Sequence, residues 1–218
     1  MTKRYPLIVF DWDGTLMDST VGIALAIQEA ARDMGLPVPT REAASHVIGL
    51  GLQDSLRSAV PSLPFERYKD FVELYRKHFH AQQETMALFE GVPEMLEELR
   101  SREHRLAVAT GKSRRGLDHA LQVTGLGAYF AATRCADETN PKPHPAMLLE
   151  LMQQGGYQAR DLLMIGDTSH DLGMAQSAGV DAVAVGYGAH PLASLSAWKP
   201  RASVDSVGEL RQWLTKNA

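Results

Sequence analysis

The feature of this sequence that most constrains its fold is a series of five short, continuous apolar runs. They are Leu7–Phe10, Leu106–Ala109, a weaker run at Ala131–Cys135, Leu162–Ile165 and Ala182–Val185. Continuous runs, in contrast to alternating ones, are typical of strands that helices cover on both faces. Helical patterns lie between most of these runs. The sequence therefore predicts an α/β fold with a mostly parallel sheet.

Several of the helical patterns have recognisable ends. Pro93 and Pro145 are suited to the first turn of a helix, because proline lacks the N–H that stays unbonded there. Ser113 is a candidate N-cap. Glycine ends three of the patterns, at Gly125, Gly155 and Gly179. Near the C-terminus, residues 200–204 are expected to form a loop and residues 207–214 a short final helix.

The first apolar run breaks the alternation, because the next run of the same kind lies far along the chain. The intervening stretch has helical patterns over 21–34 and 65–79, which are more helices than one crossover between two strands needs. The sequence therefore predicts an all-helical insert over residues 16–86. Residues 1–15 and 87–218 then form the sheet-containing core. The alternative is that these helices simply flank the sheet.

Composition and charge argue against several classes of partner. The 218 residues include 22 basic and 26 acidic side chains, so nucleic acid has no electrostatic reason to bind. The first apolar run covers only Leu7–Phe10, too short for a signal peptide, and no run approaches the roughly 20 residues of a membrane span. The single cysteine, Cys135, cannot form an internal disulfide. We expect a cytoplasmic monomer or homodimer without nucleic-acid or membrane partners.

The first candidate site is the segment DWDGT, which directly follows the first apolar run. Residues i and i+2 of an extended chain point to the same side, so Asp11 and Asp13 are expected to face one site. Ligands of open parallel sheets bind beyond the carboxyl ends of the strands, where this pair lies. Neighbouring carboxylates repel each other unless a cation or a shared proton intervenes, and Mg²⁺ takes oxygen ligands. Alone, the pair could equally belong to a turn.

Three further polar clusters follow other apolar runs or precede a helix. GDTSHD supplies Asp167 and Asp171, although Asp171 could simply favour the start of a helix through the helix dipole. TGK supplies the hydroxyl of Thr110 and, at Gly111, a close backbone approach for an anion. NPKPHP holds Lys142 in a rigid loop, where a lysine can neutralise carboxylates and hold phosphate oxygens. The hypothesis of one site depends on all four clusters lying at strand ends together.

The segments DWDGTLMDS, TGK, KPHP and GDTSHD resemble, in order and in strand context, the four motifs of the haloacid dehalogenase superfamily. The resemblance covers almost the whole chain. It is greatest to the phosphoglycolate phosphatase-like group, whose helical cap is inserted just after the first motif. This resemblance implies a Rossmann-like core with a helical cap, magnesium as cofactor, and hydrolysis of a small phosphorylated metabolite. Phosphoglycolate is the leading candidate substrate.

The resemblance also implies roles for individual residues. Asp11 is the nucleophile that attacks phosphorus and forms an aspartyl-phosphate. Asp13 is the general acid for the leaving alcohol, so it must be protonated at that moment, and then the base that activates water. Thr110 and Lys142 are catalytic residues that bind the transferring phosphoryl group, with the backbone of Gly111 beside them.

The implied metal site uses the same end of the sheet. Asp11 and Asp167 ligate Mg²⁺ directly, Asp13 ligates it through its main-chain carbonyl, and Asp171 supports the site. Phosphoryl transfer depends mostly on positioning and charge stabilisation, which Mg²⁺ and Lys142 would supply.

Other functions remain open at this point. A phosphomutase of the β-phosphoglucomutase kind shares Asp11 and Asp13, but by resemblance such mutases carry Glu-Asp where this chain has Gly166-Asp167. A binding or regulatory protein that has lost turnover is a second alternative. Pyrophosphate and nucleotides are further candidate substrates.

Three other features have more than one interpretation. The segment GLGLQD at 49–54 is either a cap loop that reaches the substrate or an ordinary connecting turn. His170 lies inside the last motif and is expected to be a bystander. Arg114 and Arg115 are expected to be exposed residues at a helix start, with contact to an anionic substrate as the alternative.

Overall fold

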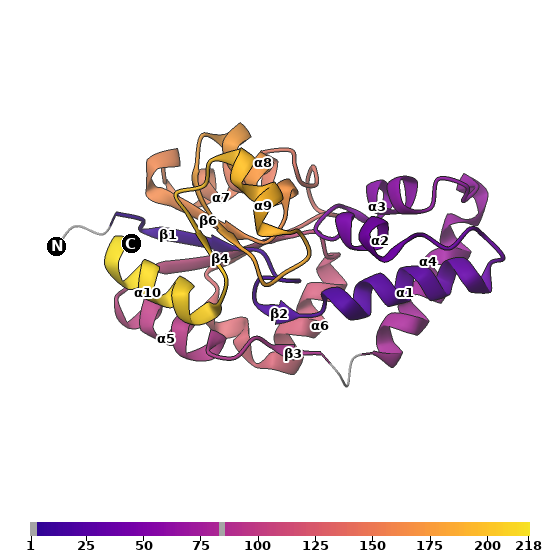
Figure 1. The fold of residues 1–218 in the computed structure, drawn as a ribbon. Coiled ribbons are helices and arrows are strands. Elements are labelled where there is room, and N and C mark those ends of the chain that lie inside the picture. Colours follow the sequence, from indigo (N-terminus) through magenta and orange to yellow (C-terminus); the bar gives the residue numbers. More distant parts are fainter. Residues whose placement is uncertain (1–3, 83–85) are drawn as a thin grey trace.

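A single parallel sheet organises the chain, for which a computed structural model describes residues 4–82 and 86–218. In this described part, six strands follow the order β5-β4-β1-β6-β7-β8 (Figure 1). They are β1 (Leu7–Phe10), β4 (Arg105–Thr110), β5 (Ala132–Cys135), β6 (Leu162–Gly166), β7 (Asp181–Val185) and β8 (Ala202–Val204). Strand β1 lies in the middle and pairs in parallel with both β4 and β6. The predicted α/β fold with a parallel sheet is confirmed.

Strand β8 corrects the expectation of a loop over 200–204. Residues 202–204 pair with β7, in a register that sets Ala202 opposite Val183. The strand is short, lies at the edge of the sheet and is only partly buried. An edge strand of this kind needs no continuous apolar run, so its sequence carries no strand signal. The other five strands match the predicted runs to within one residue at each end.

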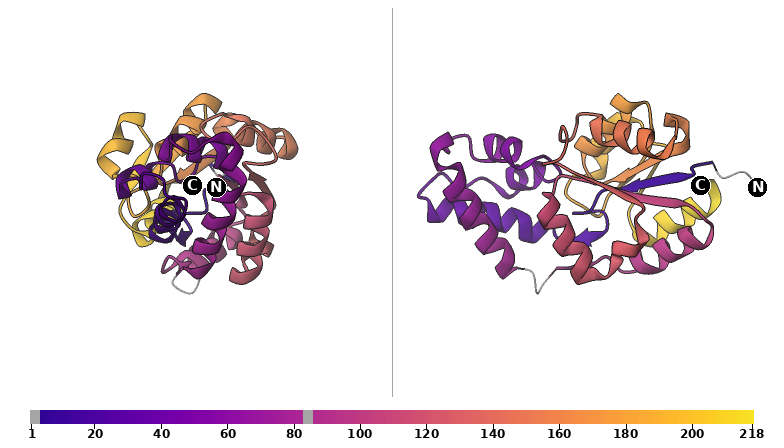
Figure 2. Two further views of the ribbon diagram at one scale, coloured as in Figure 1. Left: turned by 90° about the vertical axis from the view of Figure 1, so that its right-hand side faces the viewer. Right: turned by 180° about the vertical axis from the view of Figure 1, so that it is seen from behind.

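Helices cover both faces of the sheet (Figures 1 and 2). One face packs against α7 (Ala146–Gly155), α8 (Ser169–Ala178) and α9 (Leu192–Leu195), and the other against α5 (Val92–Ser101), α6 (Arg114–Thr124) and α10 (Val207–Asn217). Alternate residues of β1 divide between these layers. Ile8 and Phe10 belong to the apolar cluster with α5, and Leu7 and Val9 to the cluster with α7. Both faces of β1 are therefore buried, as a continuous apolar run predicts.

The helix ends follow from local residues. Ser113 caps α6, because its hydroxyl accepts a hydrogen bond from a backbone N–H of the first turn. Gly125 ends α6 and Gly179 ends α8 in the left-handed conformation, with φ of 70° and 68°. The predicted end of α7 is wrong by one residue. Gly155 is still helical, and Gly156 is the left-handed residue that ends the helix.

The segment between β1 and β4 forms a helical lobe at one end of the sheet (Figure 2). Its α-helices in the described chain are α1 (Thr20–Asp33), α2 (Arg41–His46), α3 (Leu52–Ala59) and α4 (Tyr68–Ala81). Buried side chains such as Ile27 and Phe71 give these helices an apolar cluster separate from the two that flank the sheet. A two-stranded ribbon of β2 (Met17–Asp18) and β3 (Ala87–Leu88) joins the lobe to the core.

This lobe agrees with the predicted all-helical insert, and we call it the cap. Its predicted limits at residues 16 and 86 stay a prediction, and residues 83–85 beside the second limit lie outside the described residues.

None of the helices in the described chain is long and apolar enough to cross a membrane. The cytoplasmic location also stays a prediction.

The cap core offers a matched test of packing. Phe71 is fully buried, whereas Phe65, also in the cap, is 74% exposed. We expect Phe71→Ala to lower the free energy of unfolding by about 3–5 kcal/mol, because it removes a buried ring and leaves a cavity. Phe65→Ala should change it by less than about 0.5 kcal/mol. Urea denaturation of both variants measures this, and equal effects would contradict the burial of Phe71.

Candidate active site

The central strand β1 brings two carboxylates to the edge where the parallel strands end. Asp11 follows β1 and still donates its N–H to the carbonyl of Ile165, at 2.9 Å. Asp11 is fully buried and Asp13 is 7% exposed. The chain then turns at Gly14, where φ is 79° and an added Cβ would lie 2.2 Å from Oδ2 of Asp167. Glycine is therefore required here by both the backbone conformation and the close approach.

The two strands that flank β1 supply further polar groups. Thr110 is the last residue of β4, and Asp167 directly follows β6. Asp167 is held in place by the hydroxyl of Thr15, which donates to Oδ1 at 2.8 Å, and by the N–H of Ala189, which donates to Oδ2 at 2.7 Å. The sheet order thus brings together side chains that are far apart in the sequence.

Lys142 lies in the loop between β5 and α7 and is buried between two carboxylates. Its Nζ is 2.8 Å from Oδ1 of Asp11 and 2.6 Å from Oδ1 of Asp171. Burial acts to lower the pKa of Lys142, but the charges of Asp11 and Asp171 outweigh it and raise the pKa above its ordinary value. Lys142 is therefore an ammonium ion, held where the sequence argument expected a neutralising charge.

The negative charge of the carboxylates nevertheless exceeds the positive charge of Lys142 at this position. Burial raises the pKa of Asp11 to about 7. Lys142 opposes this shift, and the charges of Asp171 and Asp13 add to it. Burial, followed by the charges of Asp11 and Asp171, also raises the pKa of Asp167 well above its ordinary value. Both shifts have one physical cause, which is the confinement of like charges away from water.

A divalent cation fits this cluster. Carboxylate oxygens of Asp11, Asp167 and Asp171 lie within 4.8 Å of one another. Oδ2 of Asp11 is buried and has no hydrogen-bond partner among the described residues. A cation with oxygen ligands would satisfy that oxygen and offset the excess of negative charge. The cluster can therefore hold a metal ion.

Asp171 has both of the roles that the sequence left open. Its Oδ2 accepts hydrogen bonds from the N–H and the hydroxyl of Thr168, at 3.0 and 2.6 Å, in a capping box that begins α8. Its Oδ1 contacts Lys142. The start of the helix and the charged cluster therefore use different oxygens of one carboxylate.

Asp13 points away from the carboxylate cluster. Nζ of Lys112 lies 2.8 Å from both of its carboxylate oxygens, and the hydroxyl of Ser19 donates to Oδ1 at 2.7 Å. The expected metal contact of Asp13, through its main-chain carbonyl, stays a prediction. Lys112 is the site residue that the sequence argument missed. The signal that could have found it is its place in TGK, next to Thr110 and Gly111.

The loop between α2 and α3 reaches the end of the sheet. A Cβ added at Gly111 would lie 2.5 Å from the carbonyl oxygen of Gly49 and 2.6 Å from that of Leu50. A Cβ added at Gly49 would lie 3.9 Å from Oδ2 of Asp11. The cap backbone therefore packs directly on the edge of the sheet that carries the carboxylates. Of the two interpretations of residues 49–54, the loop that reaches the site is the one the structure supports.

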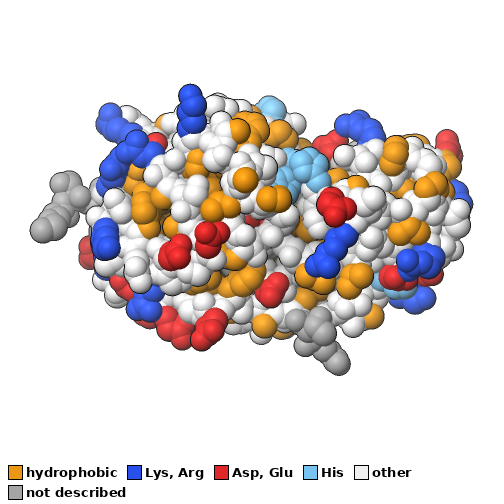
Figure 3. All heavy atoms as spheres, viewed as in Figure 1, with side chains coloured by type: hydrophobic (Ala, Val, Ile, Leu, Met, Phe, Trp, Pro, Cys, Tyr) orange, Lys and Arg blue, Asp and Glu red, His pale blue; other side chains and the backbone are white. Residues whose placement is uncertain are grey.

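Histidines join the end of α2, where this loop begins, to the core. His170 and His190 both place Nε2 within hydrogen-bond distance of the carbonyl oxygen of His46, at 2.8 and 3.0 Å. The His46 ring stacks on that of His190 with centroids 4.7 Å apart. Histidine side chains are visible where the cap meets the core (Figure 3). His170 therefore contacts the cap at the end of α2, and the expectation that it takes no part in the chemistry stays a prediction.

The protonation of His190 follows from its surroundings. Burial lowers the pKa of His190 to about 4, so its ring is neutral near pH 7. Its Nδ1 accepts a hydrogen bond from the N–H of Ser169 at 3.0 Å, which leaves the proton on Nε2 to be donated to His46. The contact with Ser169 thus fixes the tautomer of His190 that donates to the carbonyl of His46.

The arginines after TGK do not bring charge to the site. Arg114 forms ion pairs with Glu138 and Asp118, at 2.7 and 3.1 Å, and donates to the hydroxyl of Thr133. Arg115 is exposed. The expectation of exposed residues at a helix start is therefore confirmed for Arg115, whereas Arg114 is only partly exposed and is engaged in ion pairs.

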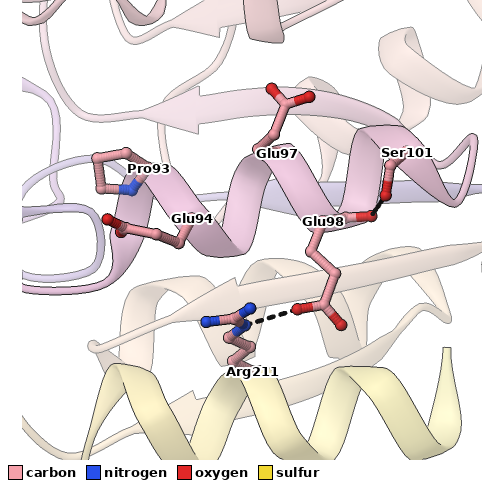
Figure 4. Close-up of a pocket in the computed structure, with 6 residues that line it drawn as sticks. All are labelled: Pro93, Glu94, Glu97, Glu98, Ser101 and Arg211. Carbon is pink, nitrogen blue, oxygen red and sulfur yellow. Dashed lines mark hydrogen bonds and ion pairs between the residues drawn. The ribbon is translucent and has the colours of Figure 1, made fainter.

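A surface groove between α5 and α10 lies apart from this site. Figure 4 shows its lining residues, which are Pro93, Glu94, Glu97, Glu98, Ser101 and Arg211. Glu98 pairs with Arg211 at 2.6 Å, and the hydroxyl of Ser101 donates to the carbonyl of Glu98 at 2.7 Å. None of these six residues belongs to the carboxylate cluster, and we assign the groove no ligand.

Comparison with known proteins identifies the family. The sequence model of the haloacid dehalogenase-like hydrolases matches residues 8–185. The chain belongs to this family. The matched span contains all four motifs, from Asp11 to Asp171, so the resemblance noted in the sequence is confirmed.

Individual relatives extend over most of the chain. Probable phosphatase IndB of Dickeya dadantii is 38% identical over 211 residues, which are 94% of this chain and 91% of the relative. The phosphoglycolate phosphatase of Aliivibrio fischeri is 33% identical over 197 residues, which are 86% of this chain and 87% of the relative. A crystal structure of a predicted phosphoglycolate phosphatase from Haemophilus somnus has 27% identity and a TM-score of 0.82, with 97% of this chain and 99% of that chain covered.

These similarities confirm two predictions from the sequence. The chain is a haloacid dehalogenase-like hydrolase of the phosphoglycolate phosphatase-like group, and its enzyme class is that of the phosphoric monoester hydrolases. The Rossmann-like core with parallel strands agrees with the fold of these neighbours.

The raised pKa of Asp11 predicts a stability effect in the presence of a chelator. The folded-state pKa of Asp11 lies above its unfolded value of 3.8, so the folded protein binds this proton more tightly than the unfolded chain. The free energy of folding that this proton contributes is fully present below pH 4 and is lost as the pH rises through about 7. We expect Asp11→Asn to be more stable than wild type at pH 8, by on the order of 1–3 kcal/mol, and the difference to shrink at pH 5.

Thermal unfolding with a chelator at both pH values measures this effect. Lys142 keeps Asp171 as a partner in the variant. Asp18→Asn is the matched control, because Asp18 is exposed. A stability difference between wild type and Asp11→Asn that does not depend on pH would contradict the shifted pKa.

The close approach at Gly111 predicts a defect in cap docking. We expect Gly111→Ala to push the loop around Gly49 away from the core, because its methyl group would overlap two cap carbonyl oxygens. Hydrogen exchange of residues 46–51 should become faster. Gly208→Ala is the control, since the nearest atom to its Cβ would be 3.8 Å away. Unchanged exchange in Gly111→Ala would show that this contact does not hold the cap.

Proposed function

We propose that the chain hydrolyses small phosphomonoesters through an aspartyl-phosphate on Asp11, with Mg²⁺ as its cofactor. The observation that carries the proposal is the buried Oδ2 of Asp11, which has no hydrogen-bond partner in the described residues and lies beside Lys142 and two more carboxylates. The other oxygen, Oδ1, contacts Lys142 and accepts the N–H of Trp12 at 2.6 Å. One oxygen is thus anchored while the other is available for chemistry.

In the first step, Asp11 attacks phosphorus and the bond from phosphorus to the ester oxygen breaks. A carboxylate nucleophile divides hydrolysis into two easier steps. Lys142 and the hydroxyl of Thr110 stabilise the transferring oxygens. The Thr110 oxygen already accepts the N–H of Lys112 at 3.2 Å, so its own proton is free to be donated to the phosphoryl group.

Asp13 moves the protons in both steps. It donates a proton to the departing alcohol oxygen, and then accepts a proton from the water that attacks the phosphorus of the aspartyl-phosphate. Its position supports this role, because it lies two residues from Asp11 while its carboxylate points outside the cluster of Asp11, Asp167 and Asp171. Asp11 is regenerated when the phosphate leaves.

The carboxylate cluster would hold the cofactor. Asp11, Asp167 and Asp171 are the side chains placed for it, with the main-chain carbonyl of Asp13 as the further ligand that the family resemblance implies. When bound, Mg²⁺ supplies positive charge that offsets the charge of the phosphoryl oxygens. Thr15 and the N–H of Ala189 orient Asp167 for this purpose.

The cap supports a small substrate and a site closed to bulk water. The backbone of Gly49 and Leu50 approaches Gly111 closely, so the cap lies against the edge of the sheet where the substrate would bind. Closure of this kind excludes water during the first step and lets the cap select the alcohol. We propose a small phosphorylated metabolite as the substrate. Phosphoglycolate is the leading candidate, because it is in the name of the Aliivibrio fischeri relative.

One contact favours hydrolysis over the mutase alternative. A Cβ added at Gly166 would lie 2.3 Å from Cγ of Asp171. The glutamate that mutases carry at this position, by the family resemblance, therefore cannot be placed here unless Asp171 moves. The alternative of a binding protein without turnover has less support, because every expected catalytic residue is present.

The proposal predicts phosphate release that depends on both Mg²⁺ and Asp11. We expect wild type to release phosphate from at least one of phosphoglycolate, sugar phosphates, nucleotides and pyrophosphate, and a chelator to abolish this release. Asp11→Asn should lower the rate by about 10³-fold or more, because the nucleophile is lost. Asp18 is an exposed carboxylate of the two-stranded ribbon, and Asp18→Asn should keep wild-type rates.

Two results would contradict the proposal. If Asp11→Asn and wild type release phosphate equally, Asp11 is not the nucleophile. If wild type isomerises a sugar phosphate without net release of phosphate, the chain is a mutase. Release from pyrophosphate alone would keep the mechanism but change the substrate class.

A further inference from the structure

The segment between β7 and α9, residues 186–191, packs against Asp167, and we call it the β7–α9 loop. A Cβ added at Gly188 would lie 2.2 Å from Oδ2 of Asp167, so glycine is what allows the backbone to approach this closely. The N–H of Ala189 donates to Oδ2 at 2.7 Å, and the N–H of His190 donates to the main-chain carbonyl of Asp167 at 3.3 Å. Three consecutive residues of the loop therefore hold one carboxylate of the cluster in place.

The same loop also contacts the cap. The side chain of Ala189 packs against the apolar cluster of the cap, which contains Ile27 and Phe71. His190 is 4% exposed, and its Nε2 donates to the carbonyl of His46 at 3.0 Å. The two imidazole rings stack, with centroids 4.7 Å apart and 7° between their planes. Two adjacent residues thus bind Asp167 through their N–H groups and the cap through their side chains.

The beginning of the loop contacts the connection between cap and core. The hydroxyl of Tyr187 donates to the carbonyl of Thr15 at 3.1 Å, and the hydroxyl of Thr15 donates to Oδ1 of Asp167 at 2.8 Å. The Tyr187 ring packs edge-to-face against Phe89, with centroids 4.7 Å apart. Phe89 directly follows β3, where the chain returns from the cap. The loop is therefore in contact with Asp167, with the cap and with the segment that joins them.

These contacts make the position of Asp167 and the docking of the cap depend on each other. Movement of the cap away from the core breaks the bond between His46 and His190 and the packing on Ala189. The N–H groups of His190 and Ala189 hold Asp167, and rigid peptide units prevent neighbouring groups from moving independently. Mg²⁺ requires near-ideal ligand geometry, so its binding would favour the arrangement seen here. A docked cap should then raise the affinity for Mg²⁺ by the same factor.

We propose that the β7–α9 loop couples docking of the cap to cation binding at Asp167, with His190 as the positioning residue that carries the coupling. The inference rests on the proposed function, because it takes Mg²⁺ as the ligand of the carboxylate cluster. It goes further by giving a regulatory task to a residue outside the four motifs. The cap then closes preferentially over a site that holds its cation, so an enclosed substrate meets a complete site.

His170 provides a matched control for His190. Both side chains donate to the same carbonyl oxygen of His46, at 2.8 and 3.0 Å, but only His190 belongs to the loop that holds Asp167. Asparagine is a suitable replacement at both positions, because it lacks the distal nitrogen that reaches His46. In His190→Asn, the amide oxygen can still accept the N–H of Ser169, as Nδ1 does in wild type.

Hydrogen exchange of residues 46–51 with and without Mg²⁺ tests the coupling. We expect saturating Mg²⁺ to slow this exchange by about fivefold or more in wild type. In His190→Asn, exchange should be faster without Mg²⁺ and should slow by less than about twofold when Mg²⁺ is added. His170→Asn should also exchange faster but keep the wild-type factor. His190→Gln, whose longer amide can donate to the carbonyl of His46, should restore part of the Mg²⁺ effect.

Mg²⁺ affinity, measured by calorimetric titration, is the reciprocal readout. The Kd should rise by about fivefold or more in His190→Asn and change by less than about twofold in His170→Asn. Unchanged exchange of the β1 amides shows that the core of each variant stays folded. The inference is wrong if Mg²⁺ slows exchange equally in His190→Asn and wild type, or if His170→Asn loses the Mg²⁺ effect as completely.

Two results for wild type separate this inference from the proposed function. If wild type binds Mg²⁺ and releases phosphate but its exchange does not respond to Mg²⁺, the coupling is absent and the proposed function stands. If wild type binds no Mg²⁺ and releases no phosphate, the proposed function fails, and the inference fails with it.

Discussion

The ion pairs of one buried lysine, Lys142, with Asp11 and Asp171 are the interaction on which the site depends. Three carboxylates in a shielded position would repel one another strongly, and each would cost free energy without a partner. Lys142 offsets part of that charge at 2.8 and 2.6 Å. The remaining excess of negative charge is what makes the cluster suited to a divalent cation. Removing the lysine would leave buried charges uncompensated, at a cost of about 3–5 kcal/mol.

The parallel sheet makes this concentration of charge possible. Strand β1 lies between β4 and β6, so the residues that follow the three strands meet at one edge although they are far apart along the chain. The apolar clusters on both faces of the sheet hold those strand ends in place, while the polar groups stay at the edge.

The cap completes the site from the other side. Its loop can approach because Gly49 and Gly111 have no side chains in the way. His170 and His190 then bind the carbonyl of His46 and secure the contact.

Local sequence signals predicted much of the fold and failed where the structure depends on distant partners. The buried strands are continuous apolar runs, and Ser113, Gly125 and Gly179 mark helix ends through their own chemistry. Strand β8 was not predicted, because this edge segment has no strand signal of its own and is extended through its pairing with β7. Lys112 was not predicted as a site residue because its partners, Asp13 and Phe79, lie about 99 and 33 positions earlier in the chain. The short cap helices α2 and α3 carry too few turns to show a period.

The sequence by itself determined the alternation of strands and helices, the helical insert, and the set of motif residues from Asp11 to Asp171. These are local properties, set by apolar runs, capping groups and residue types in order. Only the tertiary structure decided which oxygen of each carboxylate faces Lys142, that Asp13 turns toward Lys112, and that the cap loop lies against Gly111. Those outcomes depend on distances and angles between segments that are remote in sequence. They are resolved only when packing brings the strand ends and the cap together.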